Sequence, residues 1–208
     1  MSNSKSFKKN FVLIDYENVQ PKNLPLLTDS HFQIYLFLGA KQGKIDLGLV
    51  ETMHILGPER SKYVKVTQTR PNALDFHISF YLGELASIHT DAYFHVISKD
   101  KGFDPLIEHL NSRSFKAFRR ENIADIPVLG FTRNSNITEQ FDAVVRNLIG
   151  RGNSKPRKEK TLKNTIRQMF RDDLTEANIS IIFKKLAEEK YIALKNGKIS
   201  YLLPESKM

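Results

Sequence analysis

The chain has 208 residues, of which 40% are hydrophobic, and its formal net charge is +9. This composition supports a hydrophobic core and excludes global disorder. The absence of cysteine excludes a disulfide scaffold, a thiolate zinc site and a cysteine nucleophile. The sequence has no apolar run of membrane-spanning length and no signal-peptide pattern in its first ten residues, so we expect a soluble cytoplasmic protein with no membrane partner.

Residues 10–149 alternate short apolar runs with amphipathic segments. The run Phe11–Asp15 is continuously apolar until its final acid, which is typical of a buried parallel strand. Residues 73–85 place their apolar side chains on one helical stripe. This alternation predicts an α/β fold with a mostly parallel sheet and helices on both faces. The expected strands are 11–15, 32–38, 63–66, 93–97 and 115–118, with an edge strand at 128–131, and the expected helices are 73–85, 105–111 and 138–149.

The composition changes near residue 150. Gly150–Arg157 contains Gly, Ser and Pro and is typical of a linker. Two amphipathic helical patterns follow, the second with Thr175 as its expected N-cap, and then two apolar runs flank Asn196-Gly197, a strong hairpin signal. Helices followed by a hairpin predict a winged-helix-like module that binds nucleic acid or a protein. The expected organisation is a flexible N-terminus (1–9), an α/β domain (10–149), a basic linker (150–160) and the winged-helix-like domain (161–208).

Most of the basic excess lies in this last part of the chain. Residues 151–208 carry 14 of the 32 basic and 7 of the 23 acidic side chains. Such an excess attracts polyanions, because each neutralised phosphate releases counterions, although a charged linker also serves solubility. We therefore expect nucleic-acid contacts here, whereas a lysine face on a helix is also ordinary solvated surface. The expected contacts are Arg157, Lys158, Lys160, Lys184 and Lys185.

Acidic side chains follow the first and fourth expected strands, and ligands of a parallel sheet bind outside its carboxyl ends. Asp15 ends the first strand and Asp100 follows the fourth. Asp75 lies in the first turn of a helix, Asp104 lies just before another, and Asn18 follows Asp15 by three residues. Four clustered carboxylates need a cation, and oxygen-only ligands favour Mg²⁺ or Mn²⁺. Taken singly, the helix-start acids also fit capping or helix-dipole roles, and Asn18 fits a turn.

Three segments, VLIDYENVQ, NALDFHISFYLGEL and ISKDKGFDPLIEHL, occur in an informative order. Together they resemble the PIN-like superfamily of metal-dependent nucleases, particularly the NYN-type branch and related bacterial PIN-like proteins. The resemblance covers roughly residues 10–150. It implies a three-layer α/β/α sandwich and Mg²⁺- or Mn²⁺-dependent RNA cleavage, often endonucleolytic. It also implies that the active-site residues are Asp15, Asn18, Asp75, Asp100 and Asp104, with the four aspartates as metal ligands.

On this basis we expect a ribonuclease in which a carboxylate-held metal activates water for attack on phosphorus, and we expect its partner to be RNA in preference to DNA. Some members of the superfamily are inactive, so the alternative is a nucleic-acid-binding regulator with a degenerate nuclease domain. Glu17 departs from the family pattern and either faces solvent or supplies an outer contact. The sequence leaves open a homo-oligomer or an inhibitory protein partner. Candidate phosphate contacts beside the site are Lys99, Lys101, Arg119 and Arg120.

Other chemistries lack a motif. The six histidines are scattered, without metal-ligand spacing, and His77 and His95 lie in apolar segments typical of a core. No Gly-rich turn follows the first strand, which argues against dinucleotide binding, and there is no P-loop. An aspartyl-phosphate phosphatase would carry a second Asp two residues after Asp15, where Glu17 stands.

Overall fold

The apolar runs near the N-terminus form one parallel sheet. The computed structural model describes residues 8–21, 24–28, 31–127, 136–170 and 174–203, and these divide into two compact units between Ile123 and Ala124. The sheet of the first unit has the order β3-β2-β1-β4-β5, and every neighbouring pair is parallel. Its strands are β1 (Asn10–Asp15), β2 (Phe32–Leu38), β3 (Ser61–Lys65), β4 (Tyr93–Ile97) and β5 (Lys116–Arg120).

The order of the strands positions the site. Strand β1 lies at the centre, and the chain fills one side of it with β2 and β3 before it crosses to β4 on the other side. Ile14 is aligned with Ile97, so the residues that follow β1 and β4 lie side by side at the carboxyl edge. This reversal of strand order is the point at which open parallel sheets bind ligands.

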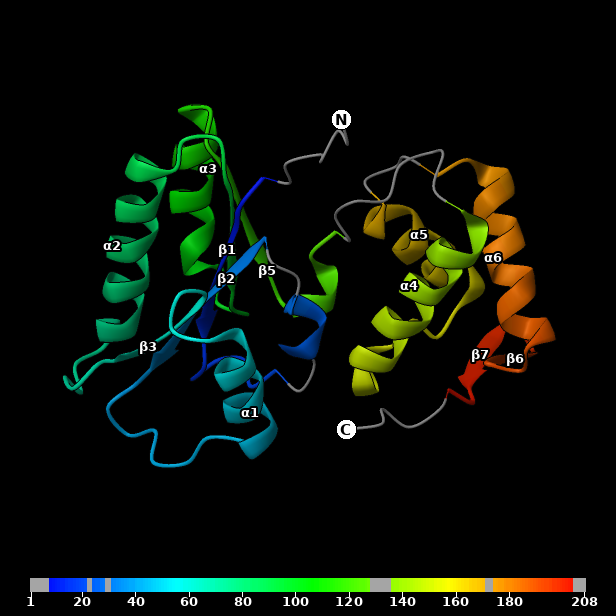
Figure 1. Ribbon diagram of the computed structural model, residues 1–208, viewed down its shortest axis with the longest axis horizontal. Coiled ribbons are helices and arrows are strands. Elements are labelled where there is room, and N and C mark those ends of the chain that lie inside the picture. Colours follow the sequence, from blue (N-terminus) through cyan, green and yellow to red (C-terminus); the bar gives the residue numbers. More distant parts are fainter. Residues whose placement is uncertain (1–7, 22–23, 29–30, 128–135, 171–173, 204–208) are drawn as a thin grey trace. The chain divides into compact units, whose positions relative to one another are not determined.

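Helices cover both faces of this sheet (Figure 1). Helices α2 (Ala73–Ile88) and α3 (Asp104–Ser112) pack on one face, where Phe11, Leu13 and Phe94 contribute to a shared core. Helix α1 (Leu47–Leu56) lies on the opposite face and begins at Asp46, whose side chain accepts a hydrogen bond from the Leu49 amide. The expected α/β sandwich is therefore present. Short 3₁₀ turns connect its elements: η1 (Leu24–Leu27), η2 (Lys101–Phe103) and η3 (Ile123–Asp125).

The described strands and helices agree closely with the sequence expectations, with one addition. The strands 32–38 and 93–97 have the expected bounds, and the expected helix at 73–85 continues to Ile88. Helix α1 was not expected, because its apolar side chains do not lie on one face: Leu49, Met53 and Leu56 are buried, whereas Leu47 and Ile55 are exposed. The expected edge strand at 128–131 lies outside the described residues.

The described residues of the second unit form three α-helices and a hairpin. The strands β6 and β7 pair in antiparallel fashion around Asn196-Gly197, both of which have positive φ, and Lys158 forms an additional antiparallel bridge with Lys198. No described helix is long and apolar enough to cross a membrane. The elements are α4 (Ile137–Gly150), η4 (Gly152–Ser154), α5 (Glu159–Met169), α6 (Glu176–Glu188), β6 (Ile192–Lys195) and β7 (Lys198–Tyr201).

Helix α4 belongs to this second unit, whereas the sequence placed residues 138–149 in the first domain. Its buried side chains Phe141, Val144 and Leu148 share one core with α5, α6 and the hairpin. The buried Asn147 amide donates to the carbonyl of Ala124 and fixes the start of the unit to the end of the helix. The Gly- and Pro-containing segment after residue 150 is therefore an internal turn of the second unit.

Candidate active site

Asp15 is a buried carboxylate at the centre of the carboxyl edge. Its side chain is fully buried, with a relative exposure of 0%. The backbone N–H of Asn18 donates to Oδ1 at 3.2 Å, and the Asn18 side-chain amide donates to Oδ2 at 2.7 Å. The Ser98 hydroxyl donates to the same Oδ2 at 2.7 Å. Three donors of this kind compensate the loss of hydration and fix the orientation of the carboxylate.

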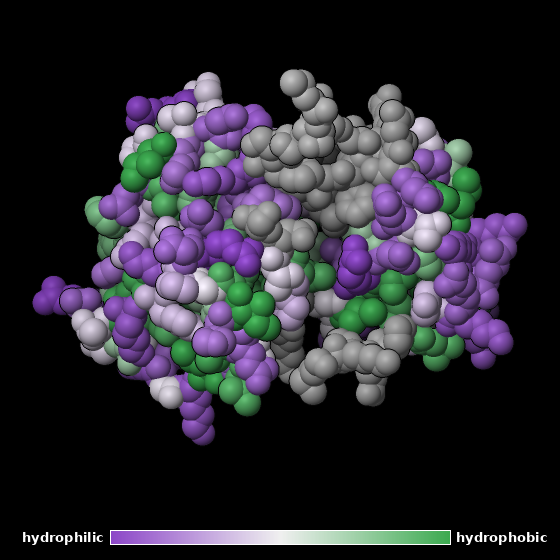
Figure 2. Space-filling model, in the orientation of Figure 1, coloured by the Kyte–Doolittle hydropathy of each residue, from purple (hydrophilic) through white to green (hydrophobic). Residues whose placement is uncertain are grey.

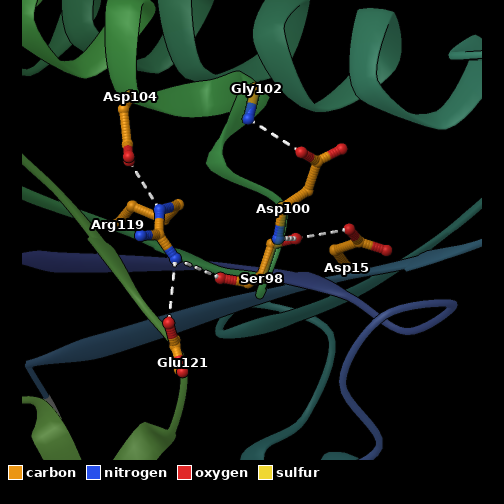
Figure 3. Close-up of polar contacts among 7 residues, drawn as sticks. All are labelled: Asp15, Ser98, Asp100, Gly102, Asp104, Arg119 and Glu121. Atoms are coloured by element: carbon orange, nitrogen blue, oxygen red, sulfur yellow. Dashed lines mark hydrogen bonds and ion pairs between the residues drawn. The ribbon is translucent and has the colours of Figure 1, made fainter.

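Ser98 is a site residue that the sequence analysis missed. It is fully buried directly after β4, and besides donating to Asp15 it accepts a hydrogen bond from the backbone N–H of Asp100 at 3.1 Å (Figure 3). Ser98 thus couples the ends of β1 and β4 through one hydroxyl. Its position in the sequence could have indicated this role. A small polar residue directly after a buried strand lies at the carboxyl edge of the sheet, where its nearest neighbour is the end of the adjacent strand.

A pocket of about 330 Å³ opens beside Asp15. Its wall includes Asp15, Asn18 and Asp75, together with the segments 39–41 and 66–75. Asp75 extends from the first turn of α2, and its pKa is raised, first by burial and then by the negative charges of Asp15, Asp100 and Glu17. The negative charges of three other carboxylates therefore act on Asp75.

Glu17 is exposed and belongs to the wall of the pocket. It lines the cavity beside Asp15, and a Cβ placed on Gly39 would lie 1.7 Å from Glu17 Oε1. The carboxylate of Glu17 therefore lies directly over Gly39, just beyond the end of β2. A residue without a side chain is needed at position 39 for this close approach.

Asp100 and Asp104 are engaged elsewhere in this structure. The carboxylate of Asp100 accepts a hydrogen bond from the Gly102 amide at 2.7 Å and caps η2. Asp104 starts α3 and accepts from Arg119 Nε at 2.6 Å, and the Arg119 guanidinium also donates to the carbonyl of Ser98 at 3.0 Å (Figure 3). Within the described part of the chain, neither aspartate belongs to the wall of the pocket.

Arg119 therefore acts within the protein in this structure, although the sequence suggested a phosphate contact. Its side chain is 14% exposed, and the hydrogen bond to Asp104 raises the pKa of its guanidinium. Arg120 donates to the buried His95 at 3.3 Å and lies over the ring of Phe118. Lys99 and Lys101 are exposed beside Asp100, where they remain candidates for phosphate contacts.

His95 and His77 have structural environments. His95 is fully buried, lies 3.1 Å from the Asn10 side-chain oxygen and stacks with Phe118. His77 is half-buried, and its Nδ1 contacts the carbonyl of Ala73 in the preceding turn of α2. The sequence had assigned both histidines to the core or its surroundings.

The oxygen donors of this edge have the chemistry that a hard divalent cation prefers. Among the described residues, however, no three Asp, Glu or His side chains stand close enough together to hold a metal ion. The donor types thus fit Mg²⁺ or Mn²⁺, whereas a complete set of ligands would require a further carboxylate to move toward Asp15 and Asp75.

A family model described as PIN domain matches residues 9–120, more than half of the chain and nearly the whole described first unit. The chain belongs to the PIN domain family. PIN domains are typically metal-dependent nucleases that act on nucleic acid, most often RNA, with Mg²⁺ or Mn²⁺. A search of the curated proteins and a search of the solved structures found no match. The assignment to the NYN branch stays a prediction.

Replacing Asp75 by Asn should raise the melting temperature of this PIN protein at pH 7 in the presence of EDTA. The pKa of Asp75 is raised in the folded state, so the folded chain binds this proton more tightly than the unfolded chain, and the ionised side chain lowers stability. The gain should shrink as the pH falls toward the ordinary value of 3.8, where Asp75 becomes protonated in both states. Thermal melts of both proteins between pH 4 and pH 8 measure it.

The matched control is Asp91→Asn. Hydrogen bonds from Lys8 and Lys116 lower the pKa of Asp91, so removing its charge should give no gain at pH 7. An Asp75→Asn protein that melts below the wild type at pH 7 would show that the carboxylate is satisfied by partners and is not under repulsion.

Proposed function

We propose that the first unit is a Mg²⁺- or Mn²⁺-dependent ribonuclease that cleaves internal phosphodiester bonds. The observation that carries the proposal is the buried carboxylate of Asp15, held by Ser98 and Asn18 at the edge of a pocket that also contains Asp75. Asp15, Glu17 and Asp75 line the same pocket, and a set of carboxylates brought together in this way fits a divalent cation. Membership of the PIN family supports the same reaction class.

The proposed metal ligands are Asp15, Asp75 and Asp100, with Asp104 as a further ligand when it is released from Arg119. When bound, Mg²⁺ or Mn²⁺ supplies an activated water and stabilises the developing charge on the leaving oxygen. Ser98 and Asn18 hold the Asp15 carboxylate in one orientation, so little reorganisation is needed at this ligand. Lys41 and Arg70 line the same pocket and would attract the phosphate backbone to the acidic site.

The test is cleavage of end-labelled single-stranded RNA by the purified chain, with single-stranded DNA in parallel, in Mg²⁺, Mn²⁺ or EDTA. The proposal expects internal cuts that require the metal and leave 3′-hydroxyl and 5′-phosphate ends. Calorimetric titration with Mn²⁺ provides a second readout that does not need the correct substrate.

We further propose that the second unit is a winged-helix-like module that holds nucleic acid. Its order of α4, a bridge at Lys158, α5, α6 and a hairpin supports this assignment, because the bridge to Lys198 adds a third extended segment to the hairpin. The Tyr201 hydroxyl donates to the carbonyl of Pro156 at 2.5 Å, and burial raises the pKa of Tyr201 to about 12. This bond ties the basic segment at 157–160 to the hairpin.

The five basic residues expected to contact nucleic acid in this unit have different surroundings. The Lys184 ammonium lies 3.4 Å from the carboxylate of Glu188, one turn further along α6. The Lys185 ammonium lies 3.6 Å from the carboxylate of Glu189, the residue that caps the helix. Arg157, Lys158 and Lys160 are exposed, and Lys158 stands opposite another lysine across the bridge. Like charges placed opposite each other repel, and a phosphate between them would relieve this repulsion. We therefore assign the main nucleic-acid contacts to the segment 157–160.

Replacing Arg157, Lys158 and Lys160 together by Ala should weaken RNA binding and flatten its dependence on salt. Each lost contact with single-stranded nucleic acid lowers the slope of log K against log salt by about 0.7, so three contacts give about two units. Fluorescence anisotropy in EDTA at several salt concentrations measures the slope. The control is Lys184→Ala with Lys185→Ala, which should change the salt slope much less. An equal change of the slope in both variants would refute the assignment.

A second candidate function is a non-catalytic nucleic-acid-binding regulator. The observation that favours it is the ion pair of Arg119 with Asp104, which holds one proposed metal ligand in a different contact. A chain that binds RNA but neither cuts it nor binds Mn²⁺ in calorimetry would select this function. A chain that binds Mn²⁺ but does not cut would select a nuclease with a different substrate or a missing activator.

A further inference from the structure

Two phenylalanines are exposed on α2 beside the pocket. Phe76 and Phe80 are 70% and 64% exposed, although α2 buries five other apolar side chains in the core. Their spacing of four residues places them one above the other on the helix surface. Asn72 lies one further turn toward the N-terminus and lines the pocket. The same helical stripe therefore leads from the wall of the pocket to the two exposed rings.

Two basic side chains are linked to this stripe, one through Tyr81 and one through the pocket. The ring of Phe80 meets that of Tyr81 edge to face, with 5.7 Å between the centroids, and the Lys62 ammonium lies 5.0 Å from the centroid of Tyr81. At the other end of the stripe, Arg70 lines the pocket. Exposed rings interleaved with cations are the arrangement by which proteins hold single-stranded nucleic acid, since the rings stack on bases and the cations contact phosphates.

The exposed rings form a small patch. Figure 2 shows hydrophobic residues in separate small patches among hydrophilic ones on the face that it presents. An aromatic side chain buries about 150–250 Å² when it is fully covered, so two such rings offer well under the roughly 800 Å² per partner that a stable protein interface needs. After Phe80 the stripe continues with Gly83, Glu84 and Ser87, which are exposed and not hydrophobic, so that they separate the two rings from Ile88 at the end of the helix. A second copy of the chain therefore fits this surface poorly.

We propose that Phe76 and Phe80 are a stacking platform for the unpaired bases of single-stranded RNA, next to the pocket in which its backbone is cut. Lys62 and Arg70 contact the phosphates on either side of the stacked bases. This rests on the proposed function only for the nature of the ligand. It adds the residues that hold the unpaired bases, because bases in a duplex are already stacked on one another and are not available to the rings. The chain therefore prefers single-stranded to double-stranded RNA.

The experiment compares two labelled 12-nucleotide oligouridines, one intact and one in which the three central bases are absent and the phosphates are kept. Binding of each to the full chain is measured by fluorescence anisotropy in EDTA, which prevents cleavage. We expect wild-type protein to bind the intact oligonucleotide more tightly. Phe76→Ala with Phe80→Ala should weaken binding of the intact oligonucleotide by about fivefold or more, since each stacked base contributes a measurable term, and should leave the abasic one unchanged.

Two further variants separate stacking from folding. Ile88→Ala removes an equally exposed apolar side chain from the far end of the same helix and should change neither affinity. Phe76→Trp with Phe80→Trp keeps a flat aromatic surface and should keep the preference for bases. Circular dichroism and the melting temperature of the Ala and Trp variants are compared with those of the wild type to exclude unfolding.

The outcomes are decisive in both directions. Equal affinity of the wild type for both oligonucleotides, or equal losses on both in the Ala variant, would overturn the platform. A dimer in sedimentation that the Ala variant converts to monomer would identify a second copy as the occupant and would also overturn it. Because binding is measured without turnover, a chain that prefers bases but never cuts retains the platform and loses the nuclease. A chain that cuts RNA without preferring bases retains the nuclease and loses the platform.

Discussion

Replacing Asp15 by Asn should lower RNA cleavage by at least about a hundredfold while RNA binding is retained. A metal-holding carboxylate contributes several kcal/mol to transition-state stabilisation, and each 1.4 kcal/mol corresponds to a factor of ten. The substitution removes the charge, and the new amide group also presents donors to Ser98 and Asn18, which already donate to this position. Cleavage of labelled RNA in Mn²⁺, with binding measured in EDTA, tests both parts.

Asp91→Asn is the matched control for this change. Asp91 is an exposed carboxylate before the amino end of β4, paired with Lys8 and Lys116, whereas Asp15 and Ser98 lie at the carboxyl edge. The control should cut at the wild-type rate and also reports on contaminating nucleases. Undiminished cleavage by Asp15→Asn would remove this residue from the catalytic site, and with it the geometry on which the proposed function depends.

A fragment of residues 124–208 should fold cooperatively, whereas a fragment of residues 150–208 should not. The longer fragment keeps α4, which supplies Phe141, Val144 and Leu148 to the core shared with α5 and α6. Each buried side chain of this kind contributes about 1.5–3 kcal/mol, so the three together contribute on the order of 5–8 kcal/mol. This equals much or all of the stability of a small domain, which is about 5–15 kcal/mol.

Circular dichroism with urea titration distinguishes the fragments. We expect a sigmoidal transition for residues 124–208, and for residues 150–208 low helix content without a transition. The two fragments share every residue of α5, α6 and the hairpin, so any difference comes from residues 124–149. A shorter fragment as stable as the longer one would return the boundary to residue 150 and leave α4 a peripheral helix.

The centre of the sheet could be predicted from the sequence because strands β1, β2 and β4 are largely buried on both faces. The residues of β1 are all buried, so they read as one continuous apolar run, and β2 and β4 show similar runs that end abruptly. The first and last apolar residues of such a run therefore predict where the strand begins and ends. Helix α1 could not be predicted, because Leu47 and Ile55, both 70% exposed, place apolar side chains outside its buried face.

Three residues of the pocket wall could be predicted from the sequence, but Ser98 and the contacts among the site residues could not. Asp15, Asn18 and Asp75 line one pocket, since strand ends and helix starts meet at the carboxyl edge of a parallel sheet. The pairing of Asp104 with Arg119 joins residues 15 positions apart. Sequence spacing alone does not distinguish this ion pair from a free ligand and a free phosphate contact.

The parallel α/β sheet, the acids at its edge and the basic character of the last 58 residues could be predicted from the sequence. Hydrophobic runs and charge are local properties, so they can be recognised without knowing the packing. Tertiary structure alone decided that Ser98 and Asn18 hold Asp15, that Glu17 lies over Gly39, and that α4 joins the second unit. These outcomes depend on which surfaces pack together, and an amphipathic helix such as α4 can bury its apolar face against either neighbour. Packing therefore sets both the limits of the second unit and the arrangement of the carboxylates in the first.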